Sequence, residues 1–194
     1  ILTVHAEDLD SDEYGVVTYS LVGEHSHHFY ISSNSGDIYV KNPLFFNREL
    51  LNETVIQVLA SDGAPGNFKR TNTVPVYVTI LDVNDNAPKF NQSTYNTTIS
   101  ENLRFNPPFL ILQVFATDED DGVNANIVYK ITSGNENDIF LLSEDTGIIY
   151  AHKSLAGKTG TFTLQIEARD GGSEPLTDLC TVNIQVVNVN DHKP

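Results

Sequence analysis

Residues 82–88 read Asp82-Val83-Asn84-Asp85-Asn86-Ala87-Pro88, and a weaker copy, Asn188-Val189-Asn190-Asp191-His192-Lys193-Pro194, ends the sequence. Each copy follows an alternating apolar run, and the two copies lie about one small domain apart. Carboxylate and amide oxygens are the ligands that a hard cation prefers. The spacing therefore predicts a tandem array of domains whose acidic linkers hold a cation.

Internal repetition extends over most of the chain. Three blocks recur in the same order in both halves, with small length changes between them. The matched blocks are Val4–Asp10 with Val114–Asp120, Phe29–Gly36 with Phe140–Gly147, and Ala60–Gly63 with Ala168–Gly171. A length of 194 residues fits two domains of ordinary size. We predict one repeat over residues 1–87 and a second over residues 88–194.

Strand patterns dominate both halves. Residues 54–60 and 162–168 alternate with period two, and residues 73–81 and 179–187 are rich in β-branched side chains. Gly, Asn, Asp and Pro separate these runs. The pattern predicts an all-β protein of two tandem seven-stranded Greek-key β-sandwiches joined by a cation-binding linker. The first repeat is expected to lack its first strand, which would expose a sheet edge.

Composition narrows the possible partners. A net charge of −15 argues against nucleic acid and anionic membrane surfaces. The single cysteine, Cys180, shares strand parity with Val182 and Ile184, so we expect it in a core rather than at a catalytic site. No apolar run is long enough to span a bilayer and no signal peptide opens the chain, as expected of a trimmed extracellular fragment.

Three N-x-S/T sequons support an extracellular setting. They place candidate glycosylation sites at Asn52, Asn91 and Asn96. Matches of this length arise by chance in a chain rich in Thr and Asn, but a glycosylated surface fits the rest of the pattern.

Taken together, these blocks resemble two consecutive extracellular repeats of the cadherin superfamily. The resemblance rests on Asp8–Asp10, Asn47–Glu49, Ala60–Asp62, Asp82–Asn86, Ser100–Asn102, Asp118–Asp120 and Ala168–Asp170. It implies β-sandwich modules with Ca²⁺ between them, and calcium-dependent adhesion between cells. The expected partners are calcium ions and another cadherin ectodomain, homophilic or heterophilic. The expected location is the ectodomain of a single-pass plasma-membrane protein.

The resemblance also implies a set of calcium ligands. For the central junction these are side chains or carbonyls of Asn47, Glu49, Val83, Asn84, Asp85, Asn86, Asp118, Asp120, Asn124 and Asp170. Asp8, Asp10 and Asp62 form half of an upstream site. Glu101, Asn190 and Asp191 remain for a downstream site, with carbonyls of Val189 and His192.

Departures from the family pattern are expected to have consequences. Asn47 stands where the family usually has Asp, which should weaken the outermost central site. The second repeat has lost the equivalent acidic block, and Leu155–Lys158 occupies that region. We therefore expect the downstream linker to bind fewer calcium ions and to bend more easily.

Other motifs in the chain bear on functions outside calcium binding. His25, His27 and His28 favour a variable loop over a transition-metal site, because no Cys or carboxylate lies at matching spacing. Neither a nucleophile motif nor a phosphate-binding loop is present, so we expect no enzyme. The chain has no Trp for strand-swapped adhesion, which favours internal repeats of a long non-classical cadherin, protocadherin-related or Fat- and Dachsous-like. Direct adhesion and a mechanical spacer both remain open.

Overall fold

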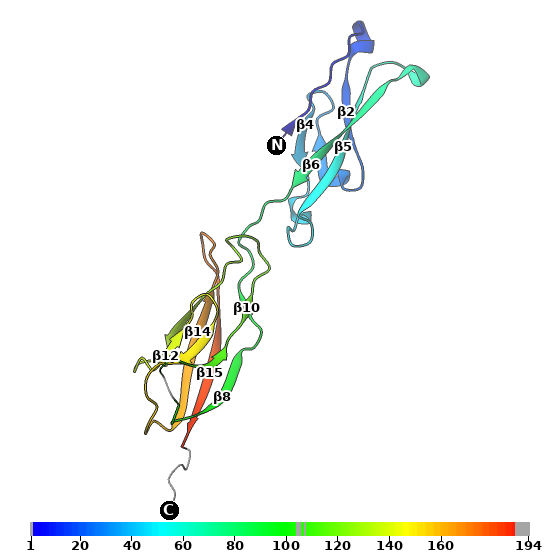
Figure 1. The fold of residues 1–194 in the computed structure, drawn as a ribbon. Helices are drawn as coiled ribbons and strands as arrows, with labels where there is room; N and C mark the ends of the chain where they lie inside the picture. Colours follow the sequence, from blue (N-terminus) through cyan, green and yellow to red (C-terminus); the bar gives the residue numbers. More distant parts are fainter. Residues whose placement is uncertain (1, 104–105, 107, 189–194) are drawn as a thin grey trace, which may run out of the picture. The chain divides into compact units, whose positions relative to one another are not determined.

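The computed structural model describes residues 2–103, 106 and 108–188 (Figure 1). The chain divides into two compact units, residues 1–81 and 82–194. Residues 82–87 belong to the second unit, and the repeat boundary at 87/88 remains a sequence prediction. None of the helical segments in the described part of the chain is long and apolar enough to cross a membrane.

The first unit consists of two three-stranded sheets, ordered β1-β4-β3 and β2-β5-β6. Short 3₁₀ turns lie between the strands, and all strand pairs in this unit are antiparallel. The strands are β1 (Leu2–Thr3), β2 (Thr18–Val22), β3 (Phe29–Ile31), β4 (Asp37–Val40), β5 (Glu53–Ser61) and β6 (Thr71–Thr79). The turns are η1 (Asp12–Gly15), η2 (Ser26–His28), η3 (Pro43–Phe45) and η4 (Gly66–Phe68).

Alternation along the strands builds the core of the first unit. In β5, Thr54, Ile56 and Val58 are buried while their neighbours face outward, as a period of two requires. Phe29 and Ile38 come from the facing sheet to meet them. The apolar face of each sheet is thus covered by the other.

The second unit has a larger four-stranded sheet, ordered β11-β14-β15-β8, and a three-stranded sheet, ordered β12-β13-β9. A short pair, β10 with β7, lies beside them. The strands are β7 (Lys89–Phe90), β8 (Thr94–Ser100), β9 (Phe109–Gln113), β10 (Ala116–Thr117), β11 (Val128–Ser133), β12 (Phe140–Leu142), β13 (Ile148–Ala151), β14 (Gly160–Arg169) and β15 (Thr177–Val187). β8 runs parallel to β15, whereas no strand among residues 2–81 pairs in this way with β6.

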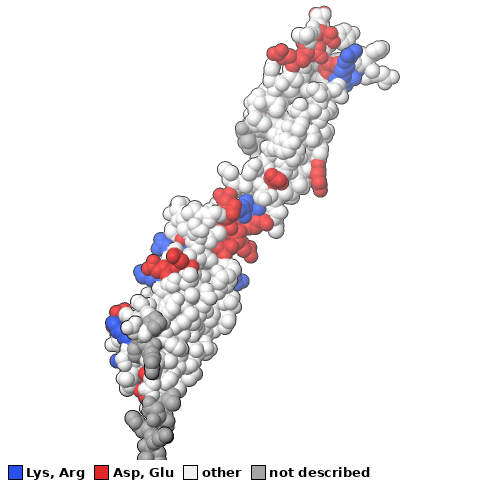
Figure 2. All heavy atoms as spheres, viewed as in Figure 1, with Lys and Arg blue, Asp and Glu red and all other residues white. Residues whose placement is uncertain are grey.

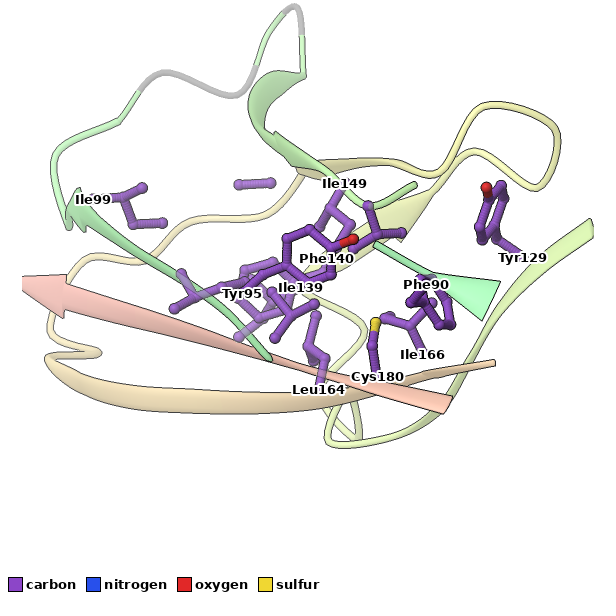
Figure 3. Close-up of a cluster of buried hydrophobic side chains, with 14 of the residues drawn as sticks. Phe90, Tyr95, Ile99, Tyr129, Ile139, Phe140, Ile149, Leu164, Ile166 and Cys180 are labelled. Atoms are coloured by element: carbon purple, nitrogen blue, oxygen red, sulfur yellow. The ribbon is translucent and has the colours of Figure 1, made fainter. Parts of the chain in front are cut away.

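The core of the second unit contains more buried side chains than that of the first. Phe140, Ile149, Leu164 and Ile166 are at most 1% exposed and interdigitate between the sheets (Figure 3). Cys180 is buried beside Ile166, as expected from its strand parity (Figure 3). Truncating a side chain such as Phe140 to Ala would cost about 3–5 kcal/mol.

Both units repeat the same internal contacts. The hydroxyl of Tyr19 accepts a hydrogen bond from the Ala6 amide at 2.8 Å, and that of Tyr129 accepts one from the Ala116 amide at 2.9 Å. Gly36 and Gly147 both have positive φ. A Cβ added at Gly36 would lie 2.3 Å from the carbonyl oxygen of Val4, and one at Gly147 would lie 2.3 Å from that of Val114. The prediction of an all-β protein with two tandem β-sandwiches is confirmed.

Candidate metal centre

The first acidic loop of the second unit follows β10. The Asp120 amide donates to Asp118 Oδ1 at 3.0 Å, a short turn that holds the two carboxylates close together. Asp120 is only 7% exposed. The first unit repeats this turn, because the Asp10 amide donates to Asp8 Oδ1 at 2.8 Å.

The second acidic loop begins where β14 ends. Asp170 is 3% exposed, and its two carboxylate oxygens accept hydrogen bonds from the amides of Gly172 (3.0 Å) and Leu176 (2.9 Å). In the first unit, Asp62 accepts in the same way from the amides of Ala64 (3.1 Å) and Arg70 (3.0 Å). The backbone thus fixes this carboxylate in position in both units.

The segment Asp82–Asn86 lies against these two loops. Asn84 Nδ2 donates to Asp170 Oδ2 at 3.1 Å and to the Glu174 carbonyl at 3.0 Å. Asn86 Nδ2 donates to Asp120 Oδ1 at 2.7 Å, and the Asn86 amide reaches Asp120 Oδ2 at 3.3 Å. The two asparagines therefore attach the segment to both acidic loops.

Gly172 makes room for Asn84. A Cβ on this glycine would lie 2.4 Å from Asn84 Cγ, closer than any real contact. The first unit has Ala64 at the equivalent place. The second unit therefore needs a glycine at position 172 because of packing against Asn84, and not because of its backbone conformation.

Asp82 belongs to the same cluster, although the ligand set predicted from the sequence does not contain it. Its Oδ2 accepts hydrogen bonds from the Asp121 amide at 3.1 Å and from Asn124 Nδ2 at 2.9 Å. One of its oxygens lies within 4.8 Å of an oxygen of Asp120. Its position as the first residue of the repeated acidic stretch is the sequence signal that could have identified it as a candidate ligand.

The cluster concentrates negative charge and leaves oxygens unused. Burial, and after it the charges of Asp120, Asp170 and Asp82, raise the pKa of the Asp118 carboxyl against the lowering effect of its bond to the Asp120 amide. Asp118 Oδ2 and Asn84 Oδ1 are buried without a hydrogen-bond partner. Buried oxygens of this kind are costly unless a donor or a cation satisfies them. A hard cation with oxygen ligands fits this donor set.

The remaining linker candidates are placed differently. Asp85 is exposed, and its carboxylate accepts a hydrogen bond from Asn86 Nδ2 at 3.0 Å. The carbonyl of Val83 accepts from the Asp85 amide at 2.8 Å. The structure thus gathers Asn84, Asn86, Asp118, Asp120, Asn124 and Asp170 in one unit, with Asp85 on the outside.

In the first unit, the candidate ligands lie in two places. Asn47 and Glu49 follow η3, where Asn47 Oδ1 accepts from the Leu50 amide at 2.9 Å and Glu49 is partly buried. Asp10 and Asp62 line a hollow of 470 Å³ together with Arg70, and Asp8 and Asp62 line a smaller one of 190 Å³. Acidic side chains form patches on the visible surface instead of an even cover (Figure 2).

At the opposite end of the second unit, Glu101 has a protein partner. It is 7% exposed, and its Oε2 accepts a hydrogen bond from the Gly157 amide at 2.8 Å. Gly157 belongs to the segment that replaced the acidic block, and Leu155 beside it is fully buried. Asn190 and Asp191, and the carbonyls of Val189 and His192, lie outside the described residues.

The histidine cluster has its own packing partners. His28 stacks on Phe45 with ring centroids 3.4 Å apart, and His25 Nδ1 lies 2.7 Å from Thr54 Oγ1. Burial, and then the nearby His27 and His25, lower the pKa of His28. Among the described residues, no histidine belongs to a group of three potential metal ligands.

The three sequons are placed on exposed residues. Asn52 lies directly before β5, Asn91 directly after β7, and Asn96 on β8. Asn91 Oδ1 accepts a hydrogen bond from the Tyr95 hydroxyl. Asn96 Oδ1 accepts one from Asn183 Nδ2 at 3.0 Å.

Comparisons with known proteins agree with this architecture. Cadherin-87A of Drosophila melanogaster is 41% identical over 192 residues, covering 98% of this chain and 10% of that protein. Cadherin-23 of Mus musculus is 36% identical over 191 residues, covering 97% of this chain and 6% of that protein. The chain therefore spans about a tenth or less of the length of these relatives.

Solved structures give the same answer. The crystal structure of mouse Cadherin-23 EC22-24 superimposes with a TM-score of 0.81 at 31% identity, covering 97% of this chain and 58% of that chain. The protocadherin gammaB7 EC3-6 cis-dimer structure gives a TM-score of 0.81 at 30% identity, over 95% of this chain and 45% of that chain. The family model of the cadherin domain matches residues 1–81 and 95–187. The chain belongs to the cadherin family and consists of two cadherin repeats.

Proposed function

We propose that the chain is a calcium-dependent adhesion segment of a long cadherin ectodomain, in which bound Ca²⁺ stiffens the linker between the repeats. The observation that carries this proposal is the pair of buried, unpartnered oxygens, Asn84 Oδ1 and Asp118 Oδ2, beside the carboxylates of Asp120 and Asp170. A cation among these groups satisfies oxygens that no protein donor reaches.

The chemistry of the donor set favours calcium. Ca²⁺ takes six to eight oxygen ligands in flexible geometry, and the cluster offers carboxylates, amide oxygens and carbonyls without thiol or imidazole. We assign Asn84, Asp118, Asp120 and Asp170 as side-chain ligands in the second unit. Val83, Asp85, Asn86 and Asn124 contribute further oxygens, and Asn47 and Glu49 contribute from the first repeat.

The same ligands explain how calcium would act mechanically. Without the cation, the carboxylates repel one another, so the acidic segment 82–86 is under electrostatic strain. With the cation, the ligands from the linker and the loops share one centre and lose their freedom to separate. Extracellular modules of this kind bind calcium with Kd of about 10⁻⁴ to 10⁻³ M. Calcium outside the cell would therefore nearly saturate the junction and keep it rigid.

The two outer ends of the chain are proposed to differ from the centre. Asp8, Asp10 and Asp62 supply half of an upstream site. At the downstream end, Glu101 shares its carboxylate with the Gly157 amide, and the region that usually supplies further acids is Leu155–Lys158. We propose fewer calcium ions and easier bending there.

A mechanical spacer is the second candidate. The chain has no Trp, so it lacks the side chain used in strand-swapped adhesion. In this case other repeats of the parent, membrane-anchored protein would contact the partner ectodomain, and these two would transmit tension. We propose no catalytic role in either case. Sedimentation of the pure chain with calcium bears on this choice, since a stable dimer favours homophilic adhesion by these repeats and a monomer favours the spacer.

The calcium proposal is tested by paired carboxylate variants. Bound ligand stabilises the folded state by about 1.4 kcal/mol at a free concentration about ten times Kd. Asp120→Asn should lose most of this calcium-dependent rise in Tm, because a neutral amide replaces a buried carboxylate. Glu119→Gln, which changes the exposed neighbour, should keep it. A calcium-dependent rise in Tm of wild-type size in both variants would exclude Asp120 as a ligand.

A further inference from the structure

The outer face of the four-stranded sheet in the second unit carries three consecutive rows of uncharged polar side chains. Strand register aligns Gln165 with Thr181 and Thr94, Thr163 with Asn183 and Asn96, and Thr161 with Gln185 and Thr98. We call these nine residues the polar ladder. The chain contains 26 acidic residues, but none of them belongs to the ladder. The strands involved, β14, β15 and β8, lie side by side (Figure 1).

Hydrogen bonds run across the ladder in a fixed direction. The Thr163 hydroxyl donates to Asn183 Oδ1 at 3.0 Å, and Asn183 Nδ2 donates to Asn96 Oδ1 at 3.0 Å. Because the Thr163 hydroxyl donates to Asn183 and the Asn183 amide nitrogen donates to Asn96, the Asn96 side chain accepts its hydrogen bond on Oδ1. Its Nδ2 therefore stays available at the end of the row.

This nitrogen is the atom that an N-linked sugar uses. Asn96 is the first residue of the sequon Asn96-Thr97-Thr98, and Thr98 points to the same face of β8 two residues later. Asn96 and Thr98 also line an open hollow of 630 Å³, together with Thr97, Thr161, Asn183 and Gln185. A sugar attached to Asn96 would begin at the rim of this hollow.

We propose that the polar ladder is a platform for the N-linked glycan of Asn96, which orders the first sugars by hydrogen bonds over β15 and β14. N-acetylglucosamine is uncharged and carries hydroxyl and amide groups, which match the Thr hydroxyls and the Gln185 amide. Thr161 donates to Gln185 Oε1 at 2.6 Å, which leaves the Gln185 Nε2 donor to face the sugar. An ordered glycan would cover this face and leave it closed to protein partners.

Release of glycans from the folded protein tests this proposal, and the test does not depend on calcium binding. The chain is produced in cells that add N-linked glycans, then treated with peptide-N-glycosidase under native conditions and followed by mass spectrometry at each sequon. Release at Asn96 should be about tenfold slower than at Asn91 or Asn52, since one or two ordinary hydrogen bonds must break first. After denaturation the three rates should agree.

Variants separate an ordered glycan from simple obstruction by the flat sheet. Asn183→Ala and Gln185→Ala, both at surface positions, should bring the native release rate at Asn96 up to that at Asn91. Glu167→Gln, on β14 one row beyond the ladder, should leave it slow. An unglycosylated Asn96, equal native rates at Asn91 and Asn96, or slow release that persists in both ladder variants would each overturn the proposal.

Discussion

Asn84 donates a hydrogen bond to Asp170 across 3.1 Å, although 86 residues separate them in the sequence. This bond brings the acidic segment that precedes the second sandwich onto the loop at the end of β14. It also turns the Asn84 amide nitrogen towards Asp170, while the amide oxygen is buried without a protein partner. The calcium proposal depends on this placement.

Substitution of Gly172 tests the placement directly. In Gly172→Ala, the new Cβ would meet Asn84 at 2.4 Å, so the Asn84 side chain must move at a cost of about 1–3 kcal/mol. We expect weaker calcium binding with the second unit still folded, measured by calorimetry and circular dichroism. Ala64→Gly changes the equivalent residue of the first unit and should not affect the central ligands. Unchanged affinity in Gly172→Ala would mean that Asn84 is not a ligand.

Glu101 is expected to stabilise the second unit without calcium. Its buried carboxylate accepts the Gly157 amide, so Glu101→Ala leaves that donor without its partner. The expected loss is about 1–3 kcal/mol in urea unfolding, equal in EDTA and in calcium. A loss seen only in calcium would instead identify Glu101 chiefly as a metal ligand.

The His28 environment predicts a pH dependence for the first unit. Burial and the neighbouring His27 and His25 lower its pKa in the folded state below the ordinary value of 6.5. The unfolded chain therefore binds this proton more readily, so stability is complete above pH 6.5 and falls as the pH drops below it. Urea unfolding at several pH values should show a smaller decrease in His28→Gln than in the wild type. His5→Gln, at an exposed site, should retain the full decrease.

Cys180 is expected to be chemically inert in the folded protein. Burial, with a smaller contribution from Asp178, raises the pKa of its thiol to about 12. At pH 8 only about one molecule in ten thousand would carry the reactive thiolate. Iodoacetamide labelling should be negligible in buffer and complete in denaturant. Rapid labelling under native conditions would show that β15 opens easily.

Much of the fold was predictable because its signals are local. Period-two alternation locates β5 and β14, and the acids that end them, Asp62 and Asp170, repeat at matching places. Asp118 and Asp120 are recognisable as a pair because their spacing is preserved as Asp8 and Asp10. Repetition within one chain supplied the comparison that a single domain lacks.

Features that depend on distant contacts were not predictable. The bond between Asn84 and Asp170, and the need for Gly172 beneath it, arise only when β14 ends next to the linker. The Glu101–Gly157 bond joins the end of β8 to a loop that the sequence showed only as a lost acidic block. Period-two patterns fix which face a residue occupies but not its neighbour on the next strand.

Calcium titration of the purified chain by calorimetry, starting from protein stripped with EDTA, tests the central claim most directly. The account predicts saturable binding of about two or three ions with Kd of about 10⁻⁴ to 10⁻³ M, the range of extracellular calcium modules. It also predicts that Asp120→Asn loses part of this stoichiometry while Glu119→Gln retains it. No saturable binding up to millimolar calcium would contradict the account and leave the acidic segment as a flexible connection.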